Sequence, residues 1–231
     1  MPSGSSARRG GGAGALVFSL PNAANWAAAS YQGTRNSTIA NGLAQPPLNA
    51  ADVQAYLLNN GLLLIPGSNS AMDYLRYNLR LLNVGGKRYK VKSGATGQVL
   101  GSVWHQGFLA HAMLIHEHFK ATPPKFIIAH SLGAASAQIL SMIWNVPAIG
   151  FAAPRLYAGG RPYTNTKLSL SLFRHDDPVG SLPGSQFRHT GTAIRLGKSK
   201  TTSLLNHSMK HYQAAITDPN HRAVLPATWP M

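Results

Sequence analysis

Short, largely apolar runs alternate with stretches of helical periodicity along most of this chain. Short apolar runs that end at turn residues are typical of strands buried inside a sheet. The runs of this kind are 62–65, 126–130, 148–152 and 168–173. Helices are predicted for residues 22–31, 49–60, 69–82, 105–119 and 203–216, and for the Ala-rich stretch after Ser131. Strands that alternate with helices predict an α/β fold with a mainly parallel central sheet and helices on both faces.

Local signals predict where several of these elements begin. Asn22 is the expected N-cap of the first helix, and Asn49 with Asp52 forms a capping pair for the second. Two further segments have the character of strands. Residues 87–93 alternate like a basic edge strand, and residues 192–196 are interpreted as the arm of a hairpin.

Composition adds a tail and a strong charge imbalance. Residues 1–19 are rich in Gly, Ser and Arg and are expected to form a flexible tail, which leaves residues 20–231 as a single domain. Lys and Arg number 21 against 6 Asp and Glu, for a formal net charge of +15. This charge either favours contact with an anionic partner, such as phospholipid, nucleic acid or an acidic protein, or only keeps the surface soluble. No apolar run approaches the roughly 20 residues that a membrane span needs.

The segment 126–137 contains the first candidate for chemistry. Its apolar run ends at Ser131 and continues at once into the Ala-rich helical pattern, which predicts a strand, a tight turn and a helix. A serine at such a turn projects its Oγ from the carboxyl edge of a sheet. Ala129 and Gly133, two residues before and after it, are small enough for the close approach of strand and helix. The alternative is that Ser131 only caps the helix.

A nucleophilic serine needs a histidine base and an acid that orients the histidine. On the α/β-hydrolase fold the acid and then the histidine follow the serine along the chain. The carboxylates after Ser131 are Asp176, Asp177 and Asp218, and the histidines after them include His189, His207, His211 and His221. Asp177 is favoured because the proline after it fixes its loop, with Asp176 in reserve. Spacing alone does not separate His207 from His211.

The oxyanion that forms during acyl transfer needs two hydrogen-bond donors. The backbone N–H of Leu132, directly after the serine, is one expected donor. Ser68, in the turn after the strand 62–65, is the other candidate because it offers both an N–H and a hydroxyl.

A group of His111, His116, Glu117 and His118 resembles a metal cluster at first sight. At helical spacing these side chains do not converge on one face, so we expect them to be exposed to solvent. No cofactor motif is present, and no cofactor is predicted.

Seven segments in order resemble motifs of the class 3 (fungal-type) lipase family of α/β-hydrolases. They are residues 25–31 (an Ala-rich helix ending in Tyr), 65–68 with 73–74 (the oxyanion turn and D-W signature), 103–108 (V-x-H-x-G-F), 129–135 (G-H-S-L-G-G-A), 151–155 (F-G-[AS]-P-R), 177–183 (D-P-V-P-x-L-P) and 207–212 (H-S-M-x-x-Y). The resemblance spans about residues 20 to 216. It singles out Asp177 as the acid and His207 as the base.

The resemblance implies a serine esterase or lipase that acts on acyl esters of the lipid or phospholipid class. Ser131 would attack the ester, His207 would take its proton and Asp177 would orient His207. The residues implied in substrate binding are Met72, Tyr74, Leu75 and His130. The helix expected at 69–82 would be either a lid over the acyl site or a permanently packed helix.

Two other readings use the same sequence differently. The basic stretches 87–92 and 195–200 would hold an enzyme on an anionic membrane surface. Alternatively, the chain is a non-catalytic binding or structural protein on a hydrolase scaffold, with a basic, anion-binding surface. Specific nucleic-acid binding is not predicted, because no recognised motif accompanies the charge.

Overall fold

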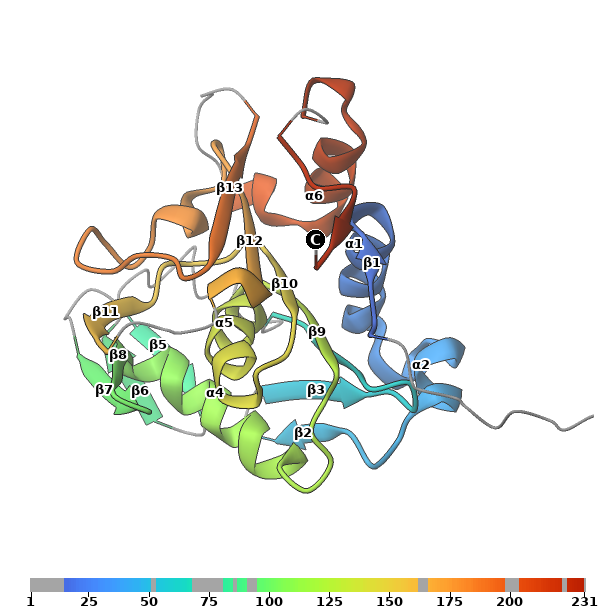
Figure 1. The fold of residues 1–231 in the computed structure, drawn as a ribbon, viewed down its shortest axis with the longest axis horizontal. Coiled ribbons are helices and arrows are strands. Elements are labelled where there is room, and N and C mark those ends of the chain that lie inside the picture. Colours follow the sequence, from blue (N-terminus) through green and yellow to red (C-terminus); the bar gives the residue numbers. More distant parts are fainter. Residues whose placement is uncertain are drawn as a thin grey trace, which may run out of the picture.

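The computed structural model describes residues 15–50, 53–67, 81–84, 87–90, 95–161, 166–197, 204–221 and 224–230. A seven-stranded sheet forms the centre of this part of the chain (Figure 1). Its strands, in spatial order, are β13 (Thr192–Leu196), β12 (Ser169–Arg174), β10 (Ala148–Phe151), β9 (Phe126–His130), β4 (Leu62–Ile65), β3 (Val53–Leu57) and β2 (Leu48–Ala50). The first five in this order are parallel, whereas β3 and β2 pair antiparallel. The central strand β9 is buried throughout, so the segment that follows it leaves the sheet at the middle of its carboxyl edge.

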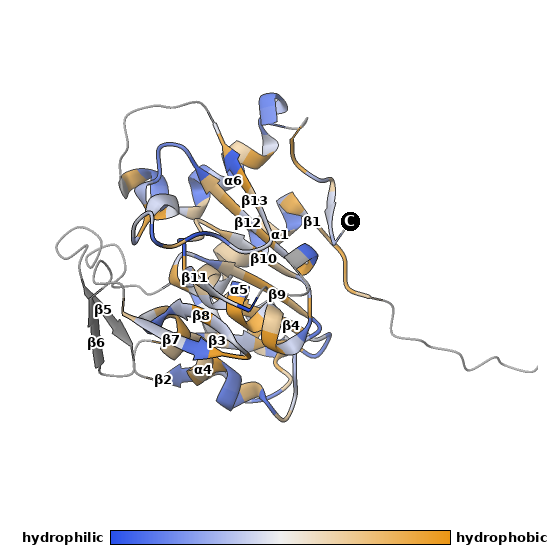
Figure 2. Cartoon of the chain, turned by 60° about the vertical axis from the view of Figure 1, so that its left-hand side comes forward, coloured by the Kyte–Doolittle hydropathy of each residue, from blue (hydrophilic) through white to orange (hydrophobic). Residues whose placement is uncertain are grey.

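Helices cover both faces of this sheet, each over its own apolar core. The helices α4 (Gln106–Phe119) and α5 (Leu132–Trp144) contribute to one core, and α1 (Leu20–Ala29) and α6 (Met209–Thr217) to the other. Figure 2 shows hydrophobic residues concentrated on the central strands between these layers. On α4 the predicted face is the buried one, consisting of Phe108, Ala112, Ile115 and Phe119. The α/β-hydrolase fold predicted from the sequence is therefore confirmed.

Smaller elements complete the described part of the chain. The strands β7 (Thr96–Val99), β8 (Ser102–His105) and β11 (Tyr157–Gly160) form a three-stranded antiparallel sheet, and β5 (Leu81–Val84) pairs with β6 (Lys87–Lys90). The remaining helices are α2 (Ser37–Gly42), η1 (Ser30–Arg35), η2 (Thr166–Leu168), η3 (Pro178–Ser181), η4 (Leu204–His207) and η5 (Pro219–His221). The strands β1 (Phe18–Ser19) and β14 (Thr228–Trp229) pair and bring the two ends of the described chain together (Figure 1). Every helix in these residues is too short or too polar to cross a bilayer.

The helix predicted for residues 49–60 is wrong. The chain forms β2 and β3 there, an antiparallel pair, and β3 also pairs with β4 on its other side. Val53, Ala55, Tyr56 and Leu57 of β3 are all buried. A strand that is paired on both edges and buried on both faces gains more from the sheet than from local helix signals, because strand preference depends on tertiary context.

Other boundaries also differ from the prediction. Residues 192–196 form β13, but it runs parallel to β12 and is not a hairpin arm. The first helix begins at Leu20 and is capped by Ser19, whose hydroxyl accepts the N–H of Asn22. The last predicted helix, 203–216, is replaced by η4 followed by α6.

The helix predicted for residues 69–82 falls mainly outside the described residues. Its last two positions, Leu81 and Leu82, lie in the strand β5. Residues 87–90 do form a strand, as the alternation of 87–93 predicts.

Candidate active site

Ser131 lies at the sharp turn between β9 and α5. Its backbone has φ 57° and ψ −122°, a left-handed φ that is strained for a residue with a side chain. Its N–H donates to the carbonyl of Phe151 at 2.9 Å, and its own carbonyl accepts the N–H of Ala134 at 2.9 Å. Hydrogen bonds on both sides hold this conformation, and the turn projects the serine from the carboxyl edge of the sheet.

The elbow depends on the absence of side chains at two nearby positions. A Cβ on Gly133 would lie 2.3 Å from the carbonyl oxygen of Ile65, at the end of the adjacent strand β4. A Cβ on Gly150 in β10 would lie 2.9 Å from the Cβ of Ala134. Helix α5 can therefore carry a methyl group at Ala134 because β10 has none opposite.

Ser131, His207 and Asp177 form a continuous hydrogen-bonded chain. The Nε2 of His207 lies 2.7 Å from Oγ of Ser131, and its Nδ1 lies 2.9 Å from Oδ2 of Asp177. Asp177 follows β12 and His207 ends η4, so three segments far apart in sequence meet at one edge of the sheet. All three side chains are buried. His211 is not in this chain, which distinguishes it from His207.

Asp177 is held as a carboxylate by three donors. Its Oδ1 accepts the N–H of Val179 at 3.0 Å, and its Oδ2 accepts both His207 Nδ1–H and the hydroxyl of Tyr212, the latter at 2.8 Å. Burial by itself would raise the pKa of Asp177, but the hydrogen bonds from these donors and the charge of His207 lower it below its usual value. With Asp177 ionised, His207 donates from Nδ1, which leaves Nε2 to accept the hydroxyl proton of Ser131.

Tyr212 was missed as a site residue by the sequence reasoning. Tyr212 is part of the motif at residues 207–212, and its position one to two helical turns after His207 is the sequence feature that could have identified it. Burial raises the pKa of Tyr212 well above its ordinary value, with the charge of Asp177 as the second cause. The hydroxyl therefore stays protonated and acts as a permanent donor to Asp177.

A second hydrogen-bonded chain runs beside the first. The N–H of Gly67 donates to the hydroxyl of Tyr31 at 3.0 Å, and Tyr31 donates in turn to Nδ1 of His130. His130 Nε2 lies 2.9 Å from the backbone carbonyl of His207, to which it donates. Burial and, next, the neighbouring charge of His207 lower the pKa of His130 to about 3, so the ring is neutral and can accept on one nitrogen and donate on the other.

His130, which is predicted to bind substrate, has both ring nitrogens bonded to the protein itself. This second chain connects the turn at Gly67 to the backbone of His207. Tyr31, which closes the quoted motif 25–31, was not singled out from the sequence.

The turn after β4 lies directly against the serine. A Cβ on Gly67 would be 2.8 Å from the Cβ of Ser131, so the backbone of this turn packs closely against the serine only because Gly67 has no side chain. Leu132 starts α5, and its N–H belongs to the first turn of the helix, where N–H groups have no intrahelical partner. Ser68, Met72, Tyr74 and Leu75 lie outside the described residues.

The other candidate residues have different partners. Asp176, the reserve acid, forms a two-pronged ion pair with Arg174 at 2.8 and 2.9 Å. His189 stacks on Phe173, and His221 accepts the N–H of Gly197. Of the candidate acids and histidines in the described residues, His207 bonds to Ser131, and Asp177 bonds to His207.

The histidines of α4 do not form a metal site. Within the described ranges, no three His, Cys, Asp or Glu side chains are grouped as metal ligands. The expectation that these residues are exposed is wrong for His111, which is buried and hydrogen-bonded to Ser136 of α5 at 2.6 Å. The helix packs His111 against α5, and the apolar stripe extends far enough around α4 to include it.

Comparison with known proteins finds solved structures with a similar fold. Neither a protein-family model nor a curated protein matches the sequence. Lipase II from Rhizopus niveus is similar with a TM-score of 0.56 and 17% identity, over 83% of this chain and 96% of that chain. The triacylglyceride lipase of Rhizomucor miehei is similar with a TM-score of 0.55 and 15% identity, over the same 83% and 96%. The Lip2 lipase from Yarrowia lipolytica has a TM-score of 0.52 and 14% identity, over 76% and 78%. The chain therefore has the α/β-hydrolase fold in the form found in fungal lipases.

Proposed function

We propose that this protein is a serine hydrolase that cleaves carboxylic acyl esters. The observation that carries the proposal is the buried chain of Ser131, His207 and Asp177, with contacts of 2.7 and 2.9 Å, at a strained strand-to-helix turn. A serine hydroxyl becomes a useful nucleophile only when a base can take its proton and a third group supports the resulting imidazolium. Both requirements have a candidate in this arrangement, His207 as the base and Asp177 as the supporting group.

In the proposed mechanism Oγ of Ser131 attacks the ester carbonyl while Nε2 of His207 takes the hydroxyl proton. Asp177 keeps the imidazole oriented and stabilises its positive charge. The N–H of Leu132 and Ser68 would hold the developing oxyanion. His207 then protonates the leaving alcohol, and the acyl-enzyme is cleaved by a water that the same histidine activates. Burial of the reacting groups strengthens each of these electrostatic contacts.

The proposed substrates are esters of the lipid class. The fold similarity to proteins described as lipases supports this class, and phospholipid is the finer alternative to neutral acylglycerol. Met72, Tyr74 and Leu75 are proposed to line the acyl site, which would suit an apolar chain. No cofactor takes part in the proposed mechanism.

Covalent labelling tests the proposal directly. A fluorophosphonate probe should label the protein, and Ser131→Ala should remove both labelling and hydrolysis of p-nitrophenyl esters. Ser141→Ala, a change in the same helix that follows the elbow, is the matched control and should label normally. Esters of increasing chain length, followed by triacylglycerol and phospholipid, would then define the substrate. A folded protein that neither labels nor hydrolyses any of these esters would leave the non-catalytic binding protein as the better account.

A further inference from the structure

Three arginines form a group on the surface that the proposed chemistry does not use. Arg155 follows β10, Arg188 lies in the segment before β13, and Arg195 lies within β13. We call these three residues the arginine face. Arg188 exchanges two backbone hydrogen bonds of 3.0 Å with Tyr157, and the N–H of Arg155 donates to Leu182 at 2.8 Å, so the segments are tied together.

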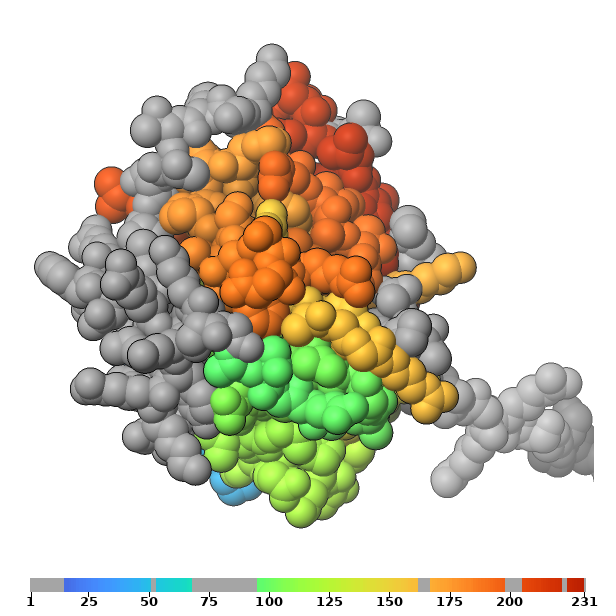
Figure 3. All heavy atoms as spheres, turned by 90° about the vertical axis from the view of Figure 1, so that its left-hand side faces the viewer, coloured from blue at the N-terminus to red at the C-terminus, as the bar shows by residue number. Residues whose placement is uncertain are grey.

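The charges of this group act on a common neighbour. The pKa of His189 is lowered to about 4, first by burial, and the charges of Arg155 and Arg195 contribute to this shift. Both guanidinium charges therefore act on the same imidazole. Figure 3 shows the segments around residues 155–161 and 180–197 beside one another on one face of the molecule.

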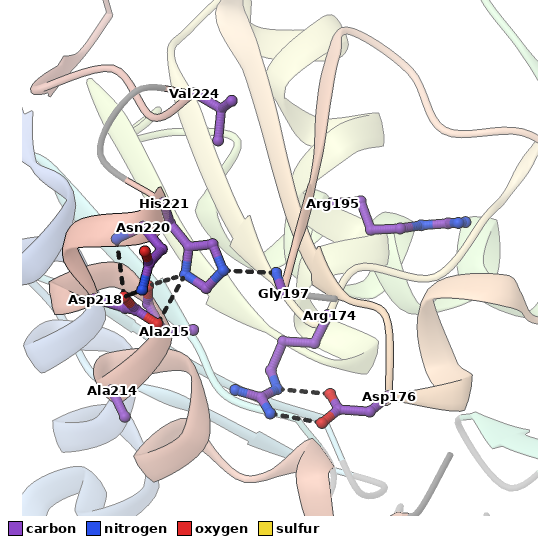
Figure 4. Close-up of a pocket in the computed structure, with 10 residues that line it drawn as sticks. All are labelled: Arg174, Asp176, Arg195, Gly197, Ala214, Ala215, Asp218, Asn220, His221 and Val224. Carbon is purple, nitrogen blue, oxygen red and sulfur yellow. Dashed lines mark hydrogen bonds and ion pairs between the residues drawn. The ribbon is translucent and has the colours of Figure 1, made fainter. Parts of the chain in front are cut away.

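The arginine face forms no ion pair among the described residues. Four of the six carboxylates in the chain are described: Glu117 pairs with Lys120, Asp176 with Arg174 and Asp177 with His207, while Asp218 accepts a hydrogen bond from Asn220. Figure 4 shows this difference in one pocket, where Arg174 is paired with Asp176 and Arg195 extends away without an ion pair. Uncompensated cations that are fixed on one face favour an anionic partner.

Two of these cations are held in place by aromatic rings. The guanidinium carbon of Arg188 lies 4.9 Å from the centre of the Tyr157 ring, and that of Arg195 lies 5.2 Å from the centre of the Phe173 ring. Phe173 in turn stacks on His189, with 4.6 Å between ring centres. Stacked guanidinium groups are already ordered, so they lose less conformational entropy when they bind an anion.

Two members of the arginine face, Arg155 and Arg195, lie at the reactive edge of the sheet, and Arg188 is tied to Tyr157 in the segment that follows Arg155. Arg155 comes after the carboxyl end of β10, and Arg195 is the last residue but one of β13. The strands β10, β12 and β13 are parallel, so both residues lie near the same edge. Ser131 follows β9 at the same edge. A surface that docks here would lie on the side of the molecule where the proposed ester chemistry takes place.

We propose that the arginine face docks this protein onto anionic phospholipid surfaces. The proposal rests on the proposed function, because an ester-cleaving site on the same edge is what favours lipid over another polyanion. Phosphate groups of lipid head groups are ligands that arginine binds well. Of the basic stretches predicted from sequence, Arg195 belongs to this face, whereas 91–92 and 198–200 lie outside the described residues.

Vesicle co-sedimentation tests the proposal separately from hydrolysis. The binding measurements use the Ser131→Ala protein, so that no lipid is cleaved, and vesicles of phosphatidylcholine with or without phosphatidylglycerol. Binding should require phosphatidylglycerol and weaken with salt. The double change Arg188→Gln with Arg195→Gln should weaken binding roughly tenfold to thirtyfold, as expected for two basic residues at an anionic membrane.

The chain offers a matched control for net charge. Lys125 and Lys167 are exposed and precede β9 and β12, at the opposite edge of the sheet. Changing both to Gln removes the same charge and should alter vesicle binding by less than about twofold. Arg188→Lys with Arg195→Lys keeps the charge and should retain most of the binding. Equal losses in the two Gln pairs, or equal binding to neutral vesicles, would overturn the proposal.

Two further measurements separate the possible failures. With Ser131 intact, the Arg188→Gln, Arg195→Gln protein should hydrolyse a soluble short-chain ester normally, which also shows that it is folded. If the parent protein binds anionic vesicles but cleaves no ester, the docking surface stands and the proposed function fails. A DNA or RNA duplex that binds more tightly than the vesicles, with the same dependence on the arginines, would replace lipid as the partner.

Discussion

The molecule contains two buried Ser–His pairs with nearly the same distance between ring nitrogen and hydroxyl oxygen, although Nε2 faces the serine in one and Nδ1 in the other. His207 lies 2.7 Å from Ser131 at the sheet edge, and His111 lies 2.6 Å from Ser136 between the helices α4 and α5. The environments differ in two ways. The other ring nitrogen of His207 donates to Asp177, whereas no carboxylate in the described part of the chain forms an ion pair with His111. Ser131 also occupies a strained turn, whereas Ser136 lies inside a regular helix.

This difference shows that a hydrogen bond between serine and histidine is not enough for reactivity. Burial lowers the pKa of His111 to about 3, and no charge among the described residues offsets that effect. Its ring therefore cannot accept a proton from Ser136 at neutral pH. The pair at His207 has the carboxylate that makes a charged imidazolium tolerable, so only this pair is suited to general-base chemistry.

Removing the carboxylate should make the first pair resemble the second. Asp177→Asn is expected to lower kcat by about 10⁴-fold, because the amide no longer stabilises the imidazolium or fixes its tautomer. Asp176→Asn is the matched control, since Asp176 is the adjacent residue and is paired with Arg174. It should change ester hydrolysis by no more than a few fold. Similar losses in the two proteins would contradict the assignment of the acid.

Removing the serine of the second pair should affect stability alone. Ser136→Ala leaves the buried ring of His111 without this partner and should reduce the free energy of unfolding by roughly 1–3 kcal/mol. Ester hydrolysis and probe labelling should remain at the parental level. Urea unfolding and initial rates, measured on the same preparation, check both parts. A large loss of activity in the folded protein would mean that the two pairs are not functionally distinct.

Tyr212 supports the carboxylate that separates the two pairs. Tyr212→Phe removes one of the donors to Asp177 and should lower kcat by about tenfold with little change in KM. Tyr157→Phe, which removes a hydroxyl that donates to the carbonyls of Gly160 and Arg161 and not to Asp177, serves as the control and should leave kcat unchanged. Equal effects on KM and kcat in Tyr212→Phe would indicate a disturbed substrate site rather than a weakened Asp177.

The last expected effect is a change in the pH dependence of stability. His111 has a pKa of about 3 in the folded protein against 6.5 when unfolded, so between these values only the unfolded state binds the proton. Stability should therefore fall as pH decreases below 6.5, with a contribution from this group of up to about 1.4 kcal/mol per pH unit. His111→Gln should reduce the slope of the unfolding free energy against pH by the amount that corresponds to one bound proton. An unchanged slope would show that His111 is not buried as described.

The sequence predicted the central part of the fold because its strands are continuous apolar runs. The runs that became β4, β9, β10 and β12 are buried on both faces, and such strands leave a clear signature. The pair β2 and β3 was mistaken for a helix, because its local signals favour a helix and only sheet pairing decides otherwise. The direction of β13 likewise depends on a long connection that local patterns do not describe.

For the candidate site, the scarcity of carboxylates limited the choice of acid. Only three follow Ser131, and the resemblance to fungal lipases singled out Asp177 and His207. The supporting tyrosines were not identified, since Tyr31 reaches His130 across 99 positions and Tyr212 reaches Asp177 across 35. The burial of His111 was missed because the helical periodicity of α4 does not show how wide its packed face is.

The contact between Ala134 and Gly150 bears on how such elbows diverge. A helix that exchanges glycine for alanine here requires a neighbouring strand without a side chain, so the two positions are constrained as a pair and not one at a time. A motif that covers only the serine turn counts Ala134 as a mismatch, although the glycine that leaves room for its methyl group, Gly150, lies sixteen residues later in the chain. A search for distant hydrolases should therefore consider the side-chain sizes at packed positions of the helix and the neighbouring strand together, and not only the residue types next to the serine.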